Sequence, residues 1–284
     1  MTASQNGHTG LAEYLKAALL ATDTATGALM GRFRSSESSI AGMDIASWEK
    51  APGELVTEAD MEADEFIKAA LSGPLTPGDI YSEEGTLERG GGDRFWLVDP
   101  LCGTRVYAAG LGLFGVSVAL VGPGNGDKAS NALELGVIAV PALKERMAAV
   151  TGRGVTRNGR PWTCEGHKGK LADVLVGVSA GRFTEDVGNG LGWVAKSAGL
   201  LGLGSAPYSL FQLAVGRLGA QVFYNAGVEH IAAGAAVCAE LGVTITDAQG
   251  QALDWKPGAV FPTVVCAWPS VHAEVLAAIA VSTS

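Results

Sequence analysis

The stretch FWLVDPLCGT at residues 95–104 constrains the fold more than any other part of this 284-residue chain. Its first four residues are apolar, and Asp99-Pro100 follows them directly. Proline has no amide hydrogen to donate to a neighbouring strand, so the stretch predicts a buried strand that ends at Asp99-Pro100. The chain is therefore expected to contain a sheet with this segment in its interior.

The other segments show strand and helix patterns in an irregular order. The strand patterns lie at residues 115–121, 135–140 and 174–179, and an Asn-Gly hairpin signal lies within 153–160. The helix patterns lie at 11–34, from Thr57 onward, and at 226–241, while the polar residues 35–54 predict a loop. Because this order is too irregular for a simple βαβ series, it predicts an α+β fold, built as a layered αβ sandwich.

Composition excludes several classes of protein. Hydrophobic residues make up 48% of the chain and charged residues 17%, which is typical of a globular protein. The net charge of −9 and the absence of a basic run argue against nucleic-acid and membrane-surface binding. The chain shows no apolar stretch long enough to cross a bilayer and no secretory signal. Its four cysteines are widely spaced, so free thiols in the cytoplasm are expected.

Five segments in chain order resemble the motifs of the inositol monophosphatase family, over roughly residues 55–234. They are LVTEAD at 55–60, SEEG at 82–85, WLVDPLCGT at 96–104, GSA at 204–206 with AVGRL at 214–218, and EHIAAG at 229–234. The resemblance implies the layered αβαβα-type sandwich of the inositol monophosphatase and sugar phosphatase superfamily. It predicts two halves of one compact unit, an N-terminal α+β part (1–180) with the DPLCGT motif and a C-terminal α/β part (181–284) contributing His230.

The family's chemistry is a magnesium-assisted attack of water on a phosphate monoester. Carried over to this sequence, the resemblance implies that Glu83, Asp99 and the carbonyl of Leu101 hold a first magnesium ion. It implies that Asp60 and Thr104 position the attacking water. All these positions keep the residue types that the family uses.

The residue types at the second magnesium position depart from the family pattern. That ion would need Asp99 together with carboxylates at positions 102 and 230, which in this chain are cysteine and histidine. Neither a thiol nor an imidazole is a good ligand for a cation that prefers oxygen. Both departures fall on the same small volume of the fold.

Cys102, His230 and Asp99 are expected to lie close together, which suggests a nucleophilic triad for acyl transfer. The N–H groups of Gly103 and Thr104 would hold the oxyanion. The exchange also resembles the Dieckmann cyclases of tetramic-acid and pyridone antibiotic biosynthesis. This implies release of a polyketide–aminoacyl thioester from a carrier protein, with Cys102 as nucleophile and His230 as base, and with no metal or organic cofactor.

Two alternatives stay open. The first is a phosphomonoesterase with an altered second metal site, in which Asp60 and Glu83 belong to a residual magnesium site, or in which Asp99, Cys102 and His230 bind a softer ion such as zinc. The second is a scaffold without catalytic activity that binds a partner. Buried cysteines are often only small core residues, which would fit this second alternative. A homodimer is also possible, since the family is commonly dimeric.

Overall fold

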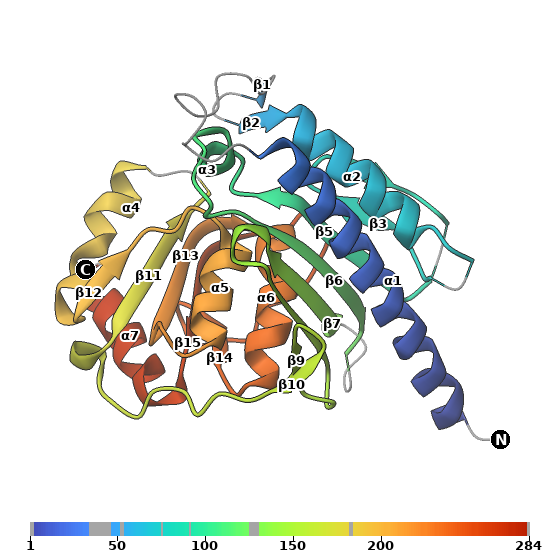
Figure 1. Ribbon diagram of the computed structural model, residues 1–284. Helices are drawn as coiled ribbons and strands as arrows, with labels where there is room; N and C mark the ends of the chain where they lie inside the picture. The colour runs from blue at the N-terminus through green and yellow to red at the C-terminus, as the bar shows by residue number, and fades with distance from the viewer. Residues whose placement is uncertain are drawn as a thin grey trace.

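The computed structural model describes residues 3–33, 47–51, 54–74, 76–90, 92–124, 131–181 and 184–282 (Figure 1). Two long helices, α1 (Ala3–Arg32) and α2 (Glu58–Leu71), pack side by side on one outer face of the molecule. Thr57 precedes α2, and its backbone N–H donates to the side chain of Asp60, which fixes the start of the helix.

The first sheet has eight strands in the described part of the chain, in the order β10-β9-β8-β7-β6-β5-β3-β4. All neighbouring pairs are antiparallel except β3 and β5. The strands are β3 (Ile80–Ser82), β4 (Gly85–Leu87), β5 (Phe95–Cys102), β6 (Gly115–Pro123), β7 (Asn131–Val140), β8 (Glu145–Val150), β9 (Val155–Arg157) and β10 (Arg160–Trp162).

The second sheet has the order β12-β11-β13-β15-β14 and mixes parallel and antiparallel pairs. Its strands are β11 (Leu175–Ala180), β12 (Gly199–Leu201), β13 (Ala220–Gly227), β14 (Thr244–Asp247) and β15 (Val260–Ala267). The remaining helical segments are α3 (Thr104–Ala108), α4 (Glu185–Asn189), α5 (Ala206–Ala214), α6 (Val228–Glu240) and α7 (Pro269–Ser282), with 3₁₀ turns at Pro141–Leu143, Leu171–Asp173 and Gly190–Lys196.

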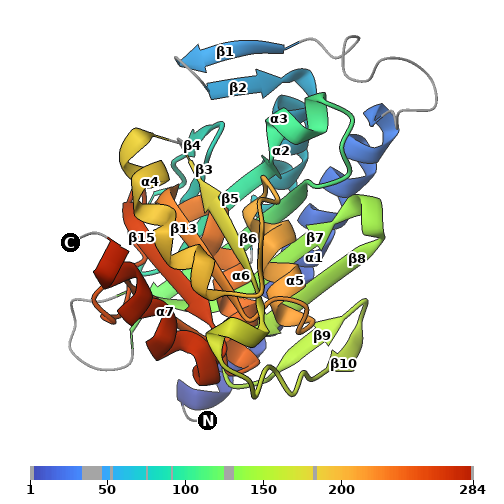
Figure 2. The ribbon, with the colours of Figure 1, turned by 90° about the vertical axis from the view of Figure 1, so that its left-hand side faces the viewer.

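These elements form five layers. Helices α1 and α2 cover the outer face of the first sheet, α5 and α6 lie between the two sheets, and α4 and α7 lie beyond the second sheet (Figures 1 and 2). One apolar core fills the space under α1 and α2, and a second fills the space around α5 and α6. The predicted αβαβα sandwich is confirmed. The two sheets divide between Trp162 and Leu175, and the boundary at residue 180 between two halves stays a prediction.

Helix α6 lies directly against the backbone of β7 because of one glycine. A Cβ atom added at Gly136 would lie 2.4 Å from the carbonyl oxygen of Ala233 and 2.8 Å from the Cβ of Ala236. Only glycine permits this approach without displacement of the helix. This close contact sets the position of the helix that carries His230.

The structure corrects two local predictions. Strand β5 does not end at Asp99-Pro100 but continues to Cys102, because a register shift against β6 removes the need for a hydrogen bond from Pro100. In the loop predicted at 35–54, residues 47–51 form β1 (Ser47–Ala51), which pairs with β2 (Glu54–Thr57). Residues 34–46, 52 and 53 lie outside the described residues. The hairpin with Asn158 and Gly159 at positive φ between β9 and β10 is confirmed.

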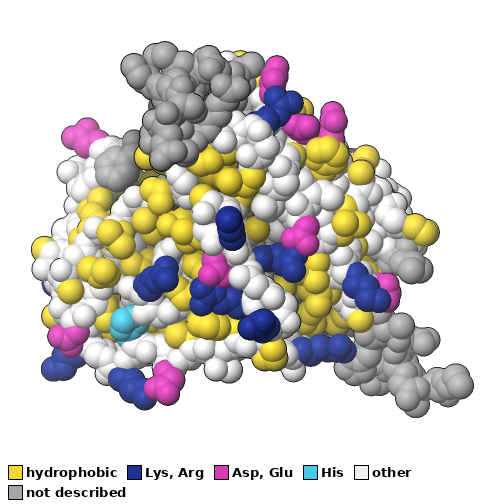
Figure 3. All heavy atoms as spheres, viewed as in Figure 1, with side chains coloured by type: hydrophobic (Ala, Val, Ile, Leu, Met, Phe, Trp, Pro, Cys, Tyr) yellow, Lys and Arg dark blue, Asp and Glu magenta, His cyan; other side chains and the backbone are white. Residues whose placement is uncertain are grey.

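The surface seen in Figure 3 mixes side chains of both charge signs with apolar ones, rather than collecting one sign on one patch. None of the helices in the described ranges combines the length and hydrophobicity that crossing a bilayer requires.

Candidate active site at the end of strand β5

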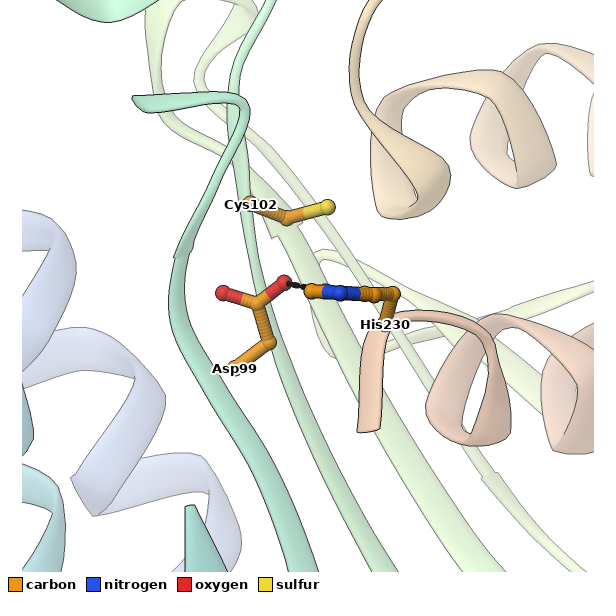
Figure 4. Close-up of side chains that lie close together, drawn as sticks. All are labelled: Asp99, Cys102 and His230. Carbon is orange, nitrogen blue, oxygen red and sulfur yellow. Dashed lines mark hydrogen bonds and ion pairs between the residues drawn. The ribbon is translucent and has the colours of Figure 1, made fainter. Parts of the chain in front are cut away.

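The register shift in β5 places two functional side chains of one strand in the same site. Asp99 pairs with Ser117 of β6, whereas Cys102 pairs with Gly115, so three steps along β5 match two steps along β6. In a regular strand, residues three apart point to opposite faces, and the extra residue of the bulge removes this alternation. Asp99 is fully buried and Cys102 is 7% exposed, and both side chains point toward His230 (Figure 4).

His230 enters the site from the first turn of α6. Its Nδ1 lies 2.6 Å from Asp99 Oδ2, which is hydrogen-bonding distance, and 3.8 Å from Glu83 Oε2. Its Nε2 lies 3.6 Å from Glu229 Oε1. The imidazole ring is thus bordered by three carboxylates, one each from β5, α6 and the turn between β3 and β4, and its side chain is 26% exposed.

The electrostatics follow from this arrangement. Burial lowers the pKa of His230, but hydrogen bonds to Asp99 and Cys102 and the charges of Asp99 and Glu83 outweigh it and hold that pKa well above its usual value. Burial, reinforced by the charge of Asp99, raises the pKa of the Cys102 thiol to about 12. Both shifts favour the protonated form of the group concerned.

A backbone group that sequence reasoning missed also contacts Cys102. The N–H of Ala206, the first residue of α5, donates to Cys102 Sγ at 3.2 Å. Ser205 caps this helix by accepting from the N–H of Tyr208 at 3.4 Å. The sequence contained a signal for this contact, because Gly-Ser-Ala belongs to one of the matched motifs and serine is a preferred helix cap. No side chain of residue 206 marks it as part of the site.

A second polar cluster joins Asp60 to Thr104, which follows Cys102 by two residues. The hydroxyl of Thr104 donates to Asp60 Oδ1 at 2.8 Å and lies 3.2 Å from the carbonyl oxygen of Leu101. The other carboxylate oxygen of Asp60 accepts from the N–H of Thr57 at 2.8 Å. Burial raises the pKa of Asp60 to about 6, although hydrogen bonds from Thr57 and Thr104 act in the opposite direction.

Gly103 and Thr104 follow β5 directly at the start of the short helix α3. Gly103 has φ of 98°, and a Cβ atom there would lie 3.0 Å from the carbonyl oxygen of Gly204. This positive φ together with the close approach explains the glycine of the motif. The predicted role of the N–H groups of Gly103 and Thr104 in holding an oxyanion stays a prediction.

The donor atoms in the site belong to two cation positions, which differ in the elements that act as ligands. Glu83 and Asp99 both face His230 Nδ1, and the carbonyl of Leu101 lies next to Asp99 in the strand, so these three supply oxygen ligands of the type that magnesium prefers. Cys102 and His230 add sulfur and nitrogen instead. The residues present therefore fit magnesium at the first position and do not fit it at the second.

Comparisons with known proteins agree on the family. The model described as the inositol monophosphatase family matches residues 11–283. The chain is 32% identical to the inositol-1-monophosphatase of Mesorhizobium japonicum over 213 residues, which are 71% of this chain and 75% of that protein. It is also 32% identical to the Nus factor SuhB of Pseudomonas aeruginosa over 226 residues, 75% of this chain and 80% of that protein. Extragenic suppressor protein suhB from Bartonella henselae superposes with a TM-score of 0.80 at 23% identity, over 93% of this chain and 97% of that chain.

These findings contradict the prediction of a metal-independent Dieckmann cyclase in tetramic-acid, pyridone or other polyketide biosynthesis. The family match and the names of the relatives point to phosphatase chemistry. The site agrees with this, because the hydroxyl of Thr104 donates to the buried carboxylate of Asp60, a contact for which a cysteine-dependent cyclase has no evident use. The structure does bring Asp99, Cys102 and His230 together, and their role as a catalytic triad stays untested.

Proposed function

Since this chain belongs to the inositol monophosphatase family, we propose that it hydrolyses phosphate monoesters with the help of a divalent cation. The observation that carries the proposal is the buried, hydrogen-bonded pair of Asp60 and Thr104, in a chain that also keeps the carboxylates of Glu83 and Asp99 next to His230. These are the positions to which the family pattern assigns water activation and the first magnesium ion.

The cation, when bound by Glu83, Asp99 and the carbonyl of Leu101, would supply positive charge to the phosphate oxygens and acidify a water molecule. The chain's own groups supply the path for a proton. The hydroxyl of Thr104 already donates to Asp60 Oδ1, so it can accept a proton from a water molecule while its own proton passes to Asp60. Two contacts from Thr57 hold Asp60 in place for this step.

The direct test is phosphate release by the purified protein with magnesium present. Inositol monophosphates and sugar phosphates are suitable substrates, because one relative is named for the first class. We expect release that stops when a chelator is added and returns when magnesium is restored. Release no faster than that of a Thr104→Val variant would contradict the proposal and would favour the scaffold without catalytic activity.

Activity should depend on pH through Asp60. Because only its carboxylate can accept the proton, and burial raises its pKa to about 6, kcat/KM should be level above about pH 7 and fall about tenfold per unit below pH 6. The measurement is a pH–rate profile between about pH 5 and 8 with saturating magnesium. A profile without an acidic limb would exclude Asp60 as the proton acceptor.

A further inference from the structure

Three ligand atoms of three different kinds meet at the second cation position. A carboxylate oxygen of Asp99, the sulfur of Cys102 and a ring nitrogen of His230 all lie within 4.8 Å of one another (Figure 4). Within the described ranges, this is the single group of three such side chains placed so closely. Two come from β5 and one from α6, so rigid elements hold all three.

The chemistry of this set selects the class of cation. Magnesium takes oxygen ligands in near-octahedral geometry and seldom takes sulfur or nitrogen from side chains. Zinc and related borderline ions accept thiolate, imidazole and carboxylate together, in tetrahedral sites. A set of one oxygen, one sulfur and one nitrogen therefore matches zinc and not magnesium.

We propose that Asp99, Cys102 and His230 form a binding site for a zinc-class divalent cation, in place of a second magnesium ion. The inference concerns the same site as the proposed phosphatase and rests on that proposal for its place in catalysis, but cation binding itself needs no substrate. With three protein ligands, the fourth tetrahedral position is left for water or a phosphate oxygen, which is the arrangement of catalytic zinc sites.

The groups around the ligands favour metal binding. The N–H of Ala206 donates to Cys102 Sγ, a contact that stabilises the negative charge of a thiolate. The N–H of Leu101 donates to Asp99 Oδ1 at 3.1 Å, which leaves Oδ2 directed at His230. Hydrogen bonds of this kind orient ligands and tune the bound ion in known metal sites.

Binding requires a small rearrangement. Two light-atom ligands on one tetrahedral zinc ion are about 3.4 Å apart, given zinc–ligand distances of about 2.0–2.2 Å. Asp99 Oδ2 and His230 Nδ1 are 2.6 Å apart, so they must separate by a little under 1 Å as the cation replaces the proton between them. The thiol of Cys102 releases its proton to solvent in the same step. The side chains of His230 and Glu83 are 26% and 27% exposed, so both reach solvent.

The test uses cobalt(II) as a spectroscopic substitute for zinc. Metal-free protein should bind one equivalent of cobalt with a near-ultraviolet thiolate-to-metal absorption band, and zinc but not magnesium should displace it. Cys102→Ser should abolish that band and weaken zinc binding at least about tenfold, because losing a ligand should cost no less than losing an outer hydrogen bond. The matched control is Cys164→Ser, a thiol outside the group, which should keep both the band and the affinity.

Cys102→Asp tests the opposite change, from a sulfur ligand to an oxygen ligand. A carboxylate at this position returns an oxygen ligand to the set, so magnesium binding should strengthen relative to zinc binding. Cobalt bound without a sulfur band, or a band that persists in Cys102→Ser, would overturn the inference. Binding is measured without substrate, so a chain that binds zinc but releases no phosphate would keep this inference and lose the proposed function. Magnesium-dependent hydrolysis without zinc or cobalt binding would support the proposed function and overturn this inference.

Discussion

Replacing Asp60 with asparagine should lower kcat for phosphate-ester hydrolysis about a thousandfold while leaving the fold intact. The amide is nearly the same size and can still accept the N–H of Thr57, but it cannot take up the proton that passes through Thr104. The measurement is steady-state phosphate release by both proteins at pH 7.5 with magnesium present. The control is Glu65→Gln, which changes an exposed carboxylate of the same helix and should leave kcat unchanged.

The same substitution should make the protein more stable. Asp60 keeps its proton up to about pH 6 when folded, against a usual value of 3.8, so the folded state binds more protons between these limits. Stability from this group is therefore fully present below about pH 4 and is lost as pH rises through 6. At pH 7.5 the ionised carboxylate costs on the order of 1–3 kcal/mol, part of which the neutral amide should recover. An inactive and less stable Asp60→Asn variant would point to a structural role for the carboxylate.

Replacing Gly136 with alanine should lower the free energy of unfolding by about 3 kcal/mol. The added methyl group would lie 2.4 Å from the carbonyl oxygen of Ala233 and 2.9 Å from its Cα, both backbone atoms of α6 that cannot rotate away. The helix has to move off β7, and the apolar contacts between the two sheets are lost in part. Denaturant unfolding followed by circular dichroism measures the change.

Gly27→Ala is the control for that substitution. Gly27 lies within α1, and a Cβ there would meet no atom within 4 Å, so alanine should stabilise the helix by about 0.5–1 kcal/mol. Because α6 carries His230, Gly136→Ala should also weaken cation binding, whereas Gly27→Ala should not. Equal stability of the two variants would contradict the tight contact between α6 and β7.

Much of the fold could be predicted from the sequence, because the matched motifs carry it. The Trp96–Thr104 stretch, with Glu83 and Asp60 before it and His230 after it, predicted both the layered sandwich and the meeting of Asp99, Cys102 and His230. Such motifs are informative because each residue type has a chemical reason to occupy its position. Gly103, for example, adopts a positive φ.

The parts that could not be predicted depend on contacts between distant segments. The continuation of β5 through Pro100 depends on its register against β6, and no local signal in β5 shows that register. The donor to Cys102 is the backbone of Ala206, 104 residues later in the chain, which any residue except proline could supply. The activity was predicted wrongly for another reason. The prediction gave more weight to the cysteine and histidine at 102 and 230 than to Asp60, Glu83 and Thr104, which keep the residue types of the family that the whole chain matches.

The bulge in β5 fixes the position of a side chain independently of its chemical type. The extra residue turns positions 99 and 102 toward one site, and backbone atoms make the pairing with Ser117 and Gly115. The strand would therefore hold a carboxylate or a thiol at 102 in the same place. Substitution there changes the chemistry of the site without changing the backbone pairing of the strand. Residue 102 can therefore alter the choice of cation while the surrounding sandwich stays as it is.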